Sequence, residues 1–352
     1  MHVNLANDWV AQGYNVEFVL LRKEGDLIPL LAPEITVTGL NVDRIRDAIY
    51  PIVVHLHKSC HQVVITAMWP LTSVVVMSWL LSGSKGKLFL SDHEHLSLSY
   101  IGQGRAKPGY LKNLIRFSYP LASGVIAVSG GVKKDLCELG KLPEKLVRVI
   151  HNPAAIGVSS VRETSRVQDQ LWGAGLDHRI LTVGRLTPEK DHKTMIKSFA
   201  LLPKELNAKL VILGEGSLRS ELEVLVTQLR LEGRVLLPGF MIDPYPWFRS
   251  ADLFVLSSLW EGFGNVIVEA FECGLPVVST NCPSGPSEIL EDGRFGRLVS
   301  TQDPRALALA IVESLHTSHD RMELMRRAQD FSVRKISDEY LAYIFLESEV
   351  PR

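Results

Sequence analysis

Two glutamates on either side of a glycine-bearing turn form the densest chemical signal in the sequence. Glu261 and Glu269 stand at the two ends of the segment EGFGNVIVE, which follows the apolar run Leu253–Leu256. Two glycines let a ligand approach the backbone, and the N–H groups that begin a helix near Asn265 favour phosphate. Glu269 lies among apolar residues, where its carboxylate needs partners such as ribose hydroxyls. The segment indicates a phosphate and sugar site, and two solvated glutamates beside a glycine turn are the alternative.

A basic loop gives the second signal. Gly184, Arg185 and Lys190 follow the predicted strand Ile180–Val183. The planar fork of an arginine and the point charge of a lysine together suit a diphosphate. Such charges meet a ligand at the carboxyl end of a parallel strand. Taken alone, the loop also fits a solvated surface.

The segment Ser91–His95 places His93 and His95 at the end of another predicted strand. Two histidines with flanking acids could bind zinc, but no further ligand cluster supports a metal there. A histidine at the mouth of a sheet can instead hydrogen-bond a sugar hydroxyl. Ligand binding and a structural role are evenly balanced for His93, and a structural role is favoured for His95.

Basic and apolar side chains alternate over Gly104–Arg116. This pattern is typical of a surface helix, and a helix resting on an anionic membrane is the alternative.

The elements that must position these residues form a repeating pattern. From Arg179 onward, short apolar runs alternate with helical stretches at least five times, which is typical of a parallel sheet. The expected strands are Ile180–Val183, Leu210–Leu213, Val235–Leu237, Leu253–Leu256, Val277–Ser279 and Gly296–Val299. The expected helices are Thr194–Leu202, Leu218–Leu229 with Ser217 as its cap, and Asn265–Cys273 closed by Gly274.

The first half has the same rhythm in a weaker form. Its expected strands are Val16–Leu21, Val63–Thr66, Leu88–Ser91, Gly124–Val128 and Val147–Ile150. Val63–Leu81 is nearly long enough to cross a bilayer, but Pro70 favours a strand followed by a helix. A helix over Met1–Val10 has no strand or phosphate-binding turn before it. We therefore expect a first domain without its usual first strand. This expectation leaves two alternatives: the protein starts upstream of Met1, or its N-terminal domain is compromised.

Length and composition limit the classes of function. With 352 residues the chain is long enough for two domains. The 38 basic and 39 acidic side chains nearly cancel, so nothing global favours nucleic acid. Four scattered cysteines and the lack of a signal sequence predict a cytoplasmic protein. The predicted division is an N-terminal domain over residues 1–152, a second domain over 153–328 and closing helices over 329–352. The stretch Ala154–Gln168 is the predicted linker between the two halves.

Together these motifs resemble the family 4 retaining glycosyltransferases of GT-B architecture over nearly the whole chain. Glu261 and Glu269 match the family's E-x7-E signature, and Gly184, Arg185 and Lys190 match its G-R-x(4)-K diphosphate site. The resemblance implies an α/β fold with two doubly wound, Rossmann-like domains that face one another across a cleft.

The resemblance also implies roles for residues. Arg185 and Lys190 would neutralise the donor diphosphate, Glu269 would bind the ribose, and Glu261 and His93 would contact the transferred sugar as the catalytic pair. The remaining donor-binding residues would be those of the glycine turns and of the segment beside the nucleobase: Gly184, Gly239, Phe240, Phe263, Gly264, Asn265 and Val266. No metal and no cofactor is implied, because two cations and a helix terminus take the place of a metal.

The implied activity is transfer of a hexosyl group from a nucleotide-diphosphate sugar to a polysaccharide, lipopolysaccharide or lipid-linked oligosaccharide, with peripheral contact with the inner membrane surface. The principal alternative is a truncated fragment that binds nucleotide sugar without transferring it. An oxidoreductase is disfavoured because Gly214 and Gly216 lack the third glycine of a dinucleotide turn, and a sugar-nucleotide epimerase is a further minor alternative.

Overall fold

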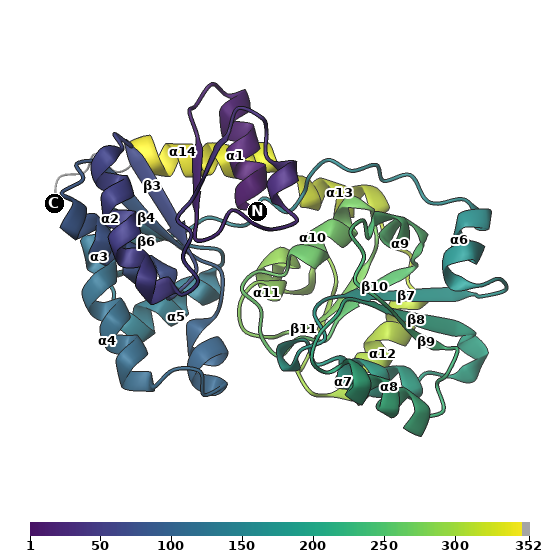
Figure 1. The fold of residues 1–352 in the computed structure, drawn as a ribbon. Helices are drawn as coiled ribbons and strands as arrows, with labels where there is room; N and C mark the ends of the chain where they lie inside the picture. Colours follow the sequence, from purple (N-terminus) through teal and green to yellow (C-terminus); the bar gives the residue numbers. More distant parts are fainter. Residues whose placement is uncertain (347–352) are drawn as a thin grey trace. The chain divides into compact units, whose positions relative to one another are not determined.

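The computed structural model describes residues 1–346, and its internal contacts divide the chain into two units (Figure 1). The first unit comprises Met1–Pro153 and the segment from Val333 onward, and the second comprises Ala154–Ser332. The boundaries expected from the sequence, after residues 152 and 328, differ from these by a few residues. Each unit is an α/β structure built on parallel strands.

The second unit contains one continuous sheet of six parallel strands. Their order is β12-β11-β10-β7-β8-β9, and every strand predicted for this half is present. Most strand residues are apolar and buried, as expected for a parallel sheet covered on both faces. The strands are β7 (His178–Val183), β8 (Ala208–Leu213), β9 (Val235–Gly239), β10 (Leu253–Leu256), β11 (Val277–Thr280) and β12 (Arg297–Val299).

Helices cover this sheet. One core cluster joins Met195, Leu222 and Ile311 to apolar side chains of the strands, so the helices that carry these residues pack on the sheet together. They are α7 (His192–Ala200), α8 (Arg219–Gln228) and α12 (Pro304–Leu315), which Figure 1 shows on one side of the strands. The remaining helices of the unit are α6 (Ser165–Trp172), α9 (Tyr245–Ser250), α10 (Asn265–Glu272), α11 (Pro286–Ile289) and α13 (Arg321–Gln329).

Two predictions for the second unit, a helix cap and the extent of the linker, were wrong. The residue that caps α8 is Leu218, without a side-chain hydrogen bond, so Ser217 does not cap this helix. The last four residues of the predicted linker Ala154–Gln168 belong to α6. Thr164 caps this helix by accepting a hydrogen bond from the backbone N–H of Val167. Gly274 does adopt the left-handed conformation expected after α10, with φ of 63°.

The strands of the first unit form two separate parallel sheets. One has the order β3-β4-β5-β6, and the other pairs β1 with β2. Strand β2 was not predicted. Among the described residues, no ladder joins β1 to β3. The strands are β1 (Glu17–Leu20), β2 (Thr36–Gly39), β3 (Val63–Ala67), β4 (Lys87–Asp92), β5 (Gly124–Ala127) and β6 (Val147–Val149).

The C-terminal helix packs within the first unit. Leu5, Ile336 and Tyr340 share a core cluster with Phe89 and Ile126 of the four-stranded sheet, so α1 and α14 both lie on this sheet. Among the described residues, no helix has the length and apolar character needed to cross a membrane. The helices are α1 (His2–Ala11), α2 (Ile49–Lys58), α3 (Leu71–Ser82), which begins after Pro70 as predicted, α4 (Pro108–Ser118), α5 (Gly130–Gly140) and α14 (Val333–Leu341).

Candidate functional site

The predicted donor-binding residues gather at one edge of the second unit's sheet. They lie in the loops that follow β7, β9 and β10 and at the start of α10. Because the three strands are parallel members of one sheet, their carboxyl ends open at the same edge, which is where doubly wound folds bind ligands.

A buried ion pair lies at the centre of this edge. The Lys190 ammonium donates a hydrogen bond to the Glu261 carboxylate at 2.5 Å, although the two residues belong to different loops. The two side chains are only 16% and 10% exposed. Ser258 donates a second hydrogen bond to the same carboxylate oxygen at 2.6 Å. A buried carboxylate with these two partners is well compensated.

Backbone contacts fix the loop that carries Lys190. The Ser257 hydroxyl donates to the Lys190 carbonyl at 2.9 Å, and the Leu259 N–H donates to the Glu189 carbonyl at 2.7 Å. The loop ends at Asp191, which caps α7 through hydrogen bonds from Thr194. The loop after β7 and the loop after β10 are thus joined directly, so the lysine and Glu261 are positioned by the same contacts.

Arg185 differs from Lys190 in its exposure. Its guanidinium donates to the Glu189 carboxylate at 3.1 Å and its side chain is 70% exposed. Burial works against ionisation of Glu189, but hydrogen bonding from Thr187 and the charges of Arg185 and Lys190 outweigh it and lower the pKa of this carboxyl. An exposed guanidinium held by one carboxylate can turn toward an anion at small cost, because exposed pairs contribute little stability.

A buried histidine supports the backbone beneath this loop. His192 is 2% exposed, and its Nε2 lies 3.1 Å from the Arg185 carbonyl. Burial lowers its pKa to about 4, so the ring is neutral at physiological pH and its N–H donates to that carbonyl. His192 is therefore a positioning residue for the Gly184–Asp191 loop, and no sequence motif identified it.

Glycines allow close backbone contact at this edge. A Cβ on Gly214 would lie 2.0 Å from the Gly184 carbonyl oxygen, and one on Gly216 would lie 2.4 Å from the Leu186 carbonyl oxygen. A Cβ on Gly285 would lie 1.8 Å from the Phe263 carbonyl oxygen. These positions admit glycine alone without backbone movement. The pair Gly214 and Gly216, examined in the sequence only as an incomplete dinucleotide turn, supports the loop after β7.

The helix α10 begins at this edge. Gly264 precedes it with φ of 101°, and Asn265 and Val266 form its first turn, where backbone N–H groups point outward. Glu269 lies one turn farther along and is partly buried. Burial, followed by the nearby charge of Glu272, raises the pKa of Glu269 to about 7. Glu269 therefore has a carboxyl that is readily protonated near neutral pH.

The other predicted donor residues have distinct positions. Phe263 is 2% exposed, and its ring packs against Phe331 with centroids 5.3 Å apart, so only its backbone is available to a ligand. Phe240 is 69% exposed and follows Gly239 at the end of β9. The sequence did not identify Thr280, whose hydroxyl donates to the Ser258 carbonyl at 2.6 Å and steadies the residue beside Glu261.

His93 lies in the first unit, at the end of β4, whereas the donor-binding residues lie in the second. Its Nε2 is 3.0 Å from the Ser91 hydroxyl, and its ring meets the His2 ring at 5.2 Å. Burial, followed by the charge of His2, lowers the pKa of His93 to about 3, which makes it a neutral hydrogen-bonding group. His95 pairs with Asp135 at 3.3 Å, in keeping with a structural role. A sugar contact by His93 stays a prediction.

Two family profiles together match most of the chain. Glycosyltransferase Family 4 matches residues 2–156, and Glycosyl transferases group 1 matches residues 174–331.

Relatives of known activity are similar over most of their length. The N-acetylgalactosamine-N,N'-diacetylbacillosaminyl-diphospho-undecaprenol 4-alpha-N-acetylgalactosaminyltransferase of Campylobacter jejuni is 32% identical over 266 residues, which cover 74% of this chain and 70% of that protein. The lipopolysaccharide core biosynthesis glycosyltransferase LpsE of Rhizobium meliloti is 35% identical over 272 residues, covering 76% of this chain and 74% of its own.

Solved structures agree with the predicted fold. HepE of Anabaena in complex with UDP superposes with a TM-score of 0.79 at 22% identity, covering 97% of this chain and 96% of its own. The lipopolysaccharide outer core galactosyltransferase WaaB gives a TM-score of 0.74 at 18% identity, with 98% of this chain and 94% of its own covered. The α/β fold with two Rossmann-like domains is confirmed. With the relatives above 30% identity, these matches show that the chain belongs to the family 4 glycosyltransferases of GT-B architecture.

Proposed function

We propose that this glycosyltransferase moves a hexosyl group from a nucleotide-diphosphate sugar to a sugar hydroxyl of a polysaccharide, lipopolysaccharide or lipid-linked oligosaccharide, with retention and without a metal or cofactor. The observation that carries the donor assignment is the buried pair of Lys190 and Glu261 beside the start of α10. A cation, a carboxylate and the first turn of a helix at one sheet edge match the parts of a nucleotide sugar.

Each donor part has a proposed partner. The diphosphate displaces Glu261 from Lys190 and draws in Arg185, whose exposed guanidinium is free to turn toward it. Glu261 then accepts hydrogen bonds from hydroxyls of the transferred sugar, and Glu269 accepts them from the ribose. Gly239 and Phe240 border the nucleobase. Two cations and the N-terminal turn of α10 stabilise the charge that grows on the leaving diphosphate, the task a metal performs elsewhere.

The proposed reaction proceeds on one face of the sugar. The bond between the anomeric carbon and the diphosphate oxygen breaks, and the acceptor oxygen bonds to the same face of that carbon. The acceptor proton passes to the departing diphosphate oxygen, so no enzyme nucleophile is required.

The relatives guide the choice of donor and acceptor. HepE has been solved in complex with UDP-glucose, and the name of the Campylobacter relative specifies an undecaprenol-linked sugar acceptor. UDP sugars and lipid-linked glycans are therefore the first substrates to test.

A lipid-linked acceptor suits an apolar surface of the first unit. Met77, Tyr110, Leu114 and Phe117 line a groove between α3 and α4, and the Phe117 side chain is 68% exposed. Lys107, Lys112 and Arg116 belong to the same region. We propose that this surface rests on the anionic inner membrane.

Co-sedimentation with vesicles that contain phosphatidylglycerol tests membrane contact. The double variant Phe117→Ser with Arg116→Ser is expected to reduce the fraction of protein bound to vesicles severalfold. An unchanged bound fraction contradicts membrane contact.

Calorimetric titration with UDP, GDP and ADP tests the donor site. At least one nucleotide is expected to bind the wild type, and Lys190→Ala is expected to weaken it about 100-fold, since a charge-assisted contact to phosphate is lost. Glu269→Ala weakens it through the ribose. Lys193→Ala is the matched control, because Lys193 pairs with Glu221 at 2.6 Å on the exposed surface. Equal loss in Lys190→Ala and Lys193→Ala, or loss in neither, places the diphosphate elsewhere.

Product analysis tests the mechanism. Transfer from an α-linked donor is expected to give an α-linked product by NMR, at a rate that EDTA leaves unchanged. A β-linked product contradicts retention, and loss of activity that Mg²⁺ or Mn²⁺ restores contradicts metal independence.

A further inference from the structure

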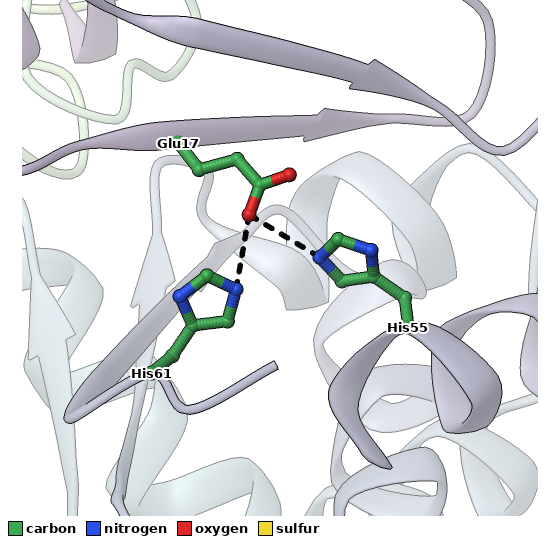
Figure 2. A group of neighbouring side chains, drawn as sticks. All are labelled: Glu17, His55 and His61. Atoms are coloured by element: carbon green, nitrogen blue, oxygen red, sulfur yellow. Dashed lines mark ion pairs between the residues drawn. The ribbon is translucent and has the colours of Figure 1, made fainter. Parts of the chain in front are cut away.

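Three side chains in the first unit converge on a single point far from the predicted donor residues in the sequence. Glu17 lies on β1, His55 lies on α2, and His61 precedes β3. Their ligand atoms all lie within 4.8 Å of one another, and Figure 2 shows both imidazole rings directed at one carboxylate oxygen.

The distances fit a shared metal ion. Glu17 Oε2 lies 3.0 Å from Nε2 of His61 and 3.4 Å from Nε2 of His55. Ligands that surround a tetrahedral zinc ion at its usual bond lengths are separated by about 3.3–3.5 Å. The two imidazole rings are stacked with centroids 5.7 Å apart, and their ligand nitrogens lie within 4.8 Å of each other. Side-chain movements of a few tenths of an ångström bring the Glu17 oxygen and each nitrogen to these separations.

Hydrogen bonding does not explain this arrangement. Both Nε2 atoms are buried, and within residues 1–346 neither has a hydrogen-bond partner, although a carboxylate oxygen is close to each. A buried ring nitrogen without a partner costs on the order of 1–3 kcal/mol. A metal ion would accept both nitrogen lone pairs and the carboxylate charge at once.

The carboxylate is oriented by a further residue. The Thr38 hydroxyl donates a hydrogen bond to Glu17 Oε1, which leaves Oε2 facing the histidines. Thr38 lies on β2, paired with β1. Metal-binding carboxylates are commonly held in this way, and such partners tune affinity.

We propose that Glu17, His55 and His61 bind one Zn²⁺ ion, with water as the fourth ligand. Two imidazoles with one carboxylate suit zinc better than Mg²⁺ or Ca²⁺, which prefer oxygen ligands alone. The ion links the β1–β2 sheet to α2 and to the start of β3, where no strand ladder joins the two sheets. Its role is to stabilise the first unit, separately from sugar transfer.

Metal binding by the whole protein tests the proposal. After treatment with EDTA and removal of the chelator, the chain is titrated with Co²⁺ and with Zn²⁺. One Co²⁺ per chain with the intense visible absorption of a tetrahedral site is expected, and Zn²⁺ displaces it. Zn²⁺, but not Mg²⁺, raises the melting temperature.

Variants identify the ligands. His55→Gln and His61→Gln are each expected to weaken Zn²⁺ binding at least about 100-fold, and Thr38→Val about tenfold. His57→Gln is the matched control on the same helix, because His57 instead contacts the Ser82 carbonyl at 3.2 Å; it retains full affinity. Circular dichroism verifies that each variant is folded.

A measurement on the wild type alone stands beside the variants. Zn²⁺ is expected to shift the NMR signals of two of the eleven histidines with one equivalent of metal. Absence of stoichiometric tetrahedral Co²⁺ binding in the wild type overturns the proposal. Full Zn²⁺ affinity in both His55→Gln and His61→Gln overturns it as well.

Discussion

The two units build their sheets differently. The second unit has six strands in one uninterrupted ladder, whereas the first divides its strands into a pair and a group of four. The uninterrupted sheet holds the ends of neighbouring strands in fixed register, so loops far apart in sequence meet at one edge. In the first unit, the pair β1–β2 depends on side-chain packing and on contacts such as the Glu17 cluster.

Charge is also used differently at the strand ends. In the second unit Lys190 and Glu261 form a buried ion pair, which an anionic ligand can rearrange. In the first unit burial lowers the pKa of His93 to about 3 and raises the pKa of Asp92 to about 7, so burial favours the neutral forms. One edge is suited to bind charge, and the other to make neutral hydrogen bonds.

The largest expected effect is on the stability of the sheet edge where the predicted donor-binding residues gather. Gly285→Ala is expected to lower the free energy of unfolding of the second unit by about 3 kcal/mol, because the new Cβ meets the Phe263 carbonyl. Gly293→Ala is the control: its φ of 104° is similar, but nothing lies within 4 Å of the added Cβ, so only the backbone strain of about 1 kcal/mol applies. Urea unfolding measures both. Equal losses would mean that close packing at this edge is unimportant.

A slightly smaller effect is expected from Glu261→Gln. Removing the charge that we propose to hold the transferred sugar is expected to slow transfer about 100-fold while changing nucleotide affinity less than tenfold. Glu221→Gln alters an exposed carboxylate paired with Lys193 and leaves the rate unchanged. Steady-state kinetics distinguish the two, and a normal rate in Glu261→Gln argues against a sugar contact.

The difference between the sheets predicts different local stability. With EDTA present, backbone amides of β1 and β2 are expected to exchange at least about tenfold faster than those of β7 and β8, because a two-stranded sheet opens at lower cost. Hydrogen exchange followed by mass spectrometry measures this. Equal protection of both sheets would show that the division in the first unit has no energetic consequence.

The smallest expected effect is a pH dependence from Glu269. Its folded pKa of about 7 lies above the ordinary glutamate pKa of 4.5, so the folded state holds its proton more tightly. This contribution to stability is full below pH 4.5 and is lost as pH rises to about 7. Glu269→Gln lacks it, so the variant gains stability relative to the wild type over this range. Thermal melts at several pH values measure the difference, and a constant difference contradicts the raised pKa.

The sequence predicted the second unit well because each of its strands is a short apolar run bounded by a helix or turn. Sequence-based prediction failed where a strand lacks an apolar run or where the exact start of a helix decides the answer. The strand Thr36–Gly39 is polar at alternate positions and follows an irregular segment, so no apolar run marks it. Ser217 has the right chemistry for a helix cap, but α8 begins at Arg219, so the cap position falls on Leu218.

The candidate site was predictable only in part. Lys190, Glu261 and Glu269 lie in local motifs, so the sequence alone could propose them. Thr280, on β11, donates to the Ser258 carbonyl after β10, a contact that depends on strand order, which single motifs do not encode. His192 contacts the Arg185 carbonyl of the loop that precedes its own helix, and no motif marks that contact. The same holds for Glu17, His55 and His61, which the fold alone brings together.

Hydrogen exchange with and without bound nucleotide tests the central claim most directly. Saturating UDP, GDP or ADP is added to the wild type, and exchange is compared peptide by peptide. The nucleotide that binds is expected to slow exchange over Gly184–Asp191 and Glu261–Glu269 in the second unit. Slower exchange confined to other segments, with these two unchanged, would contradict it.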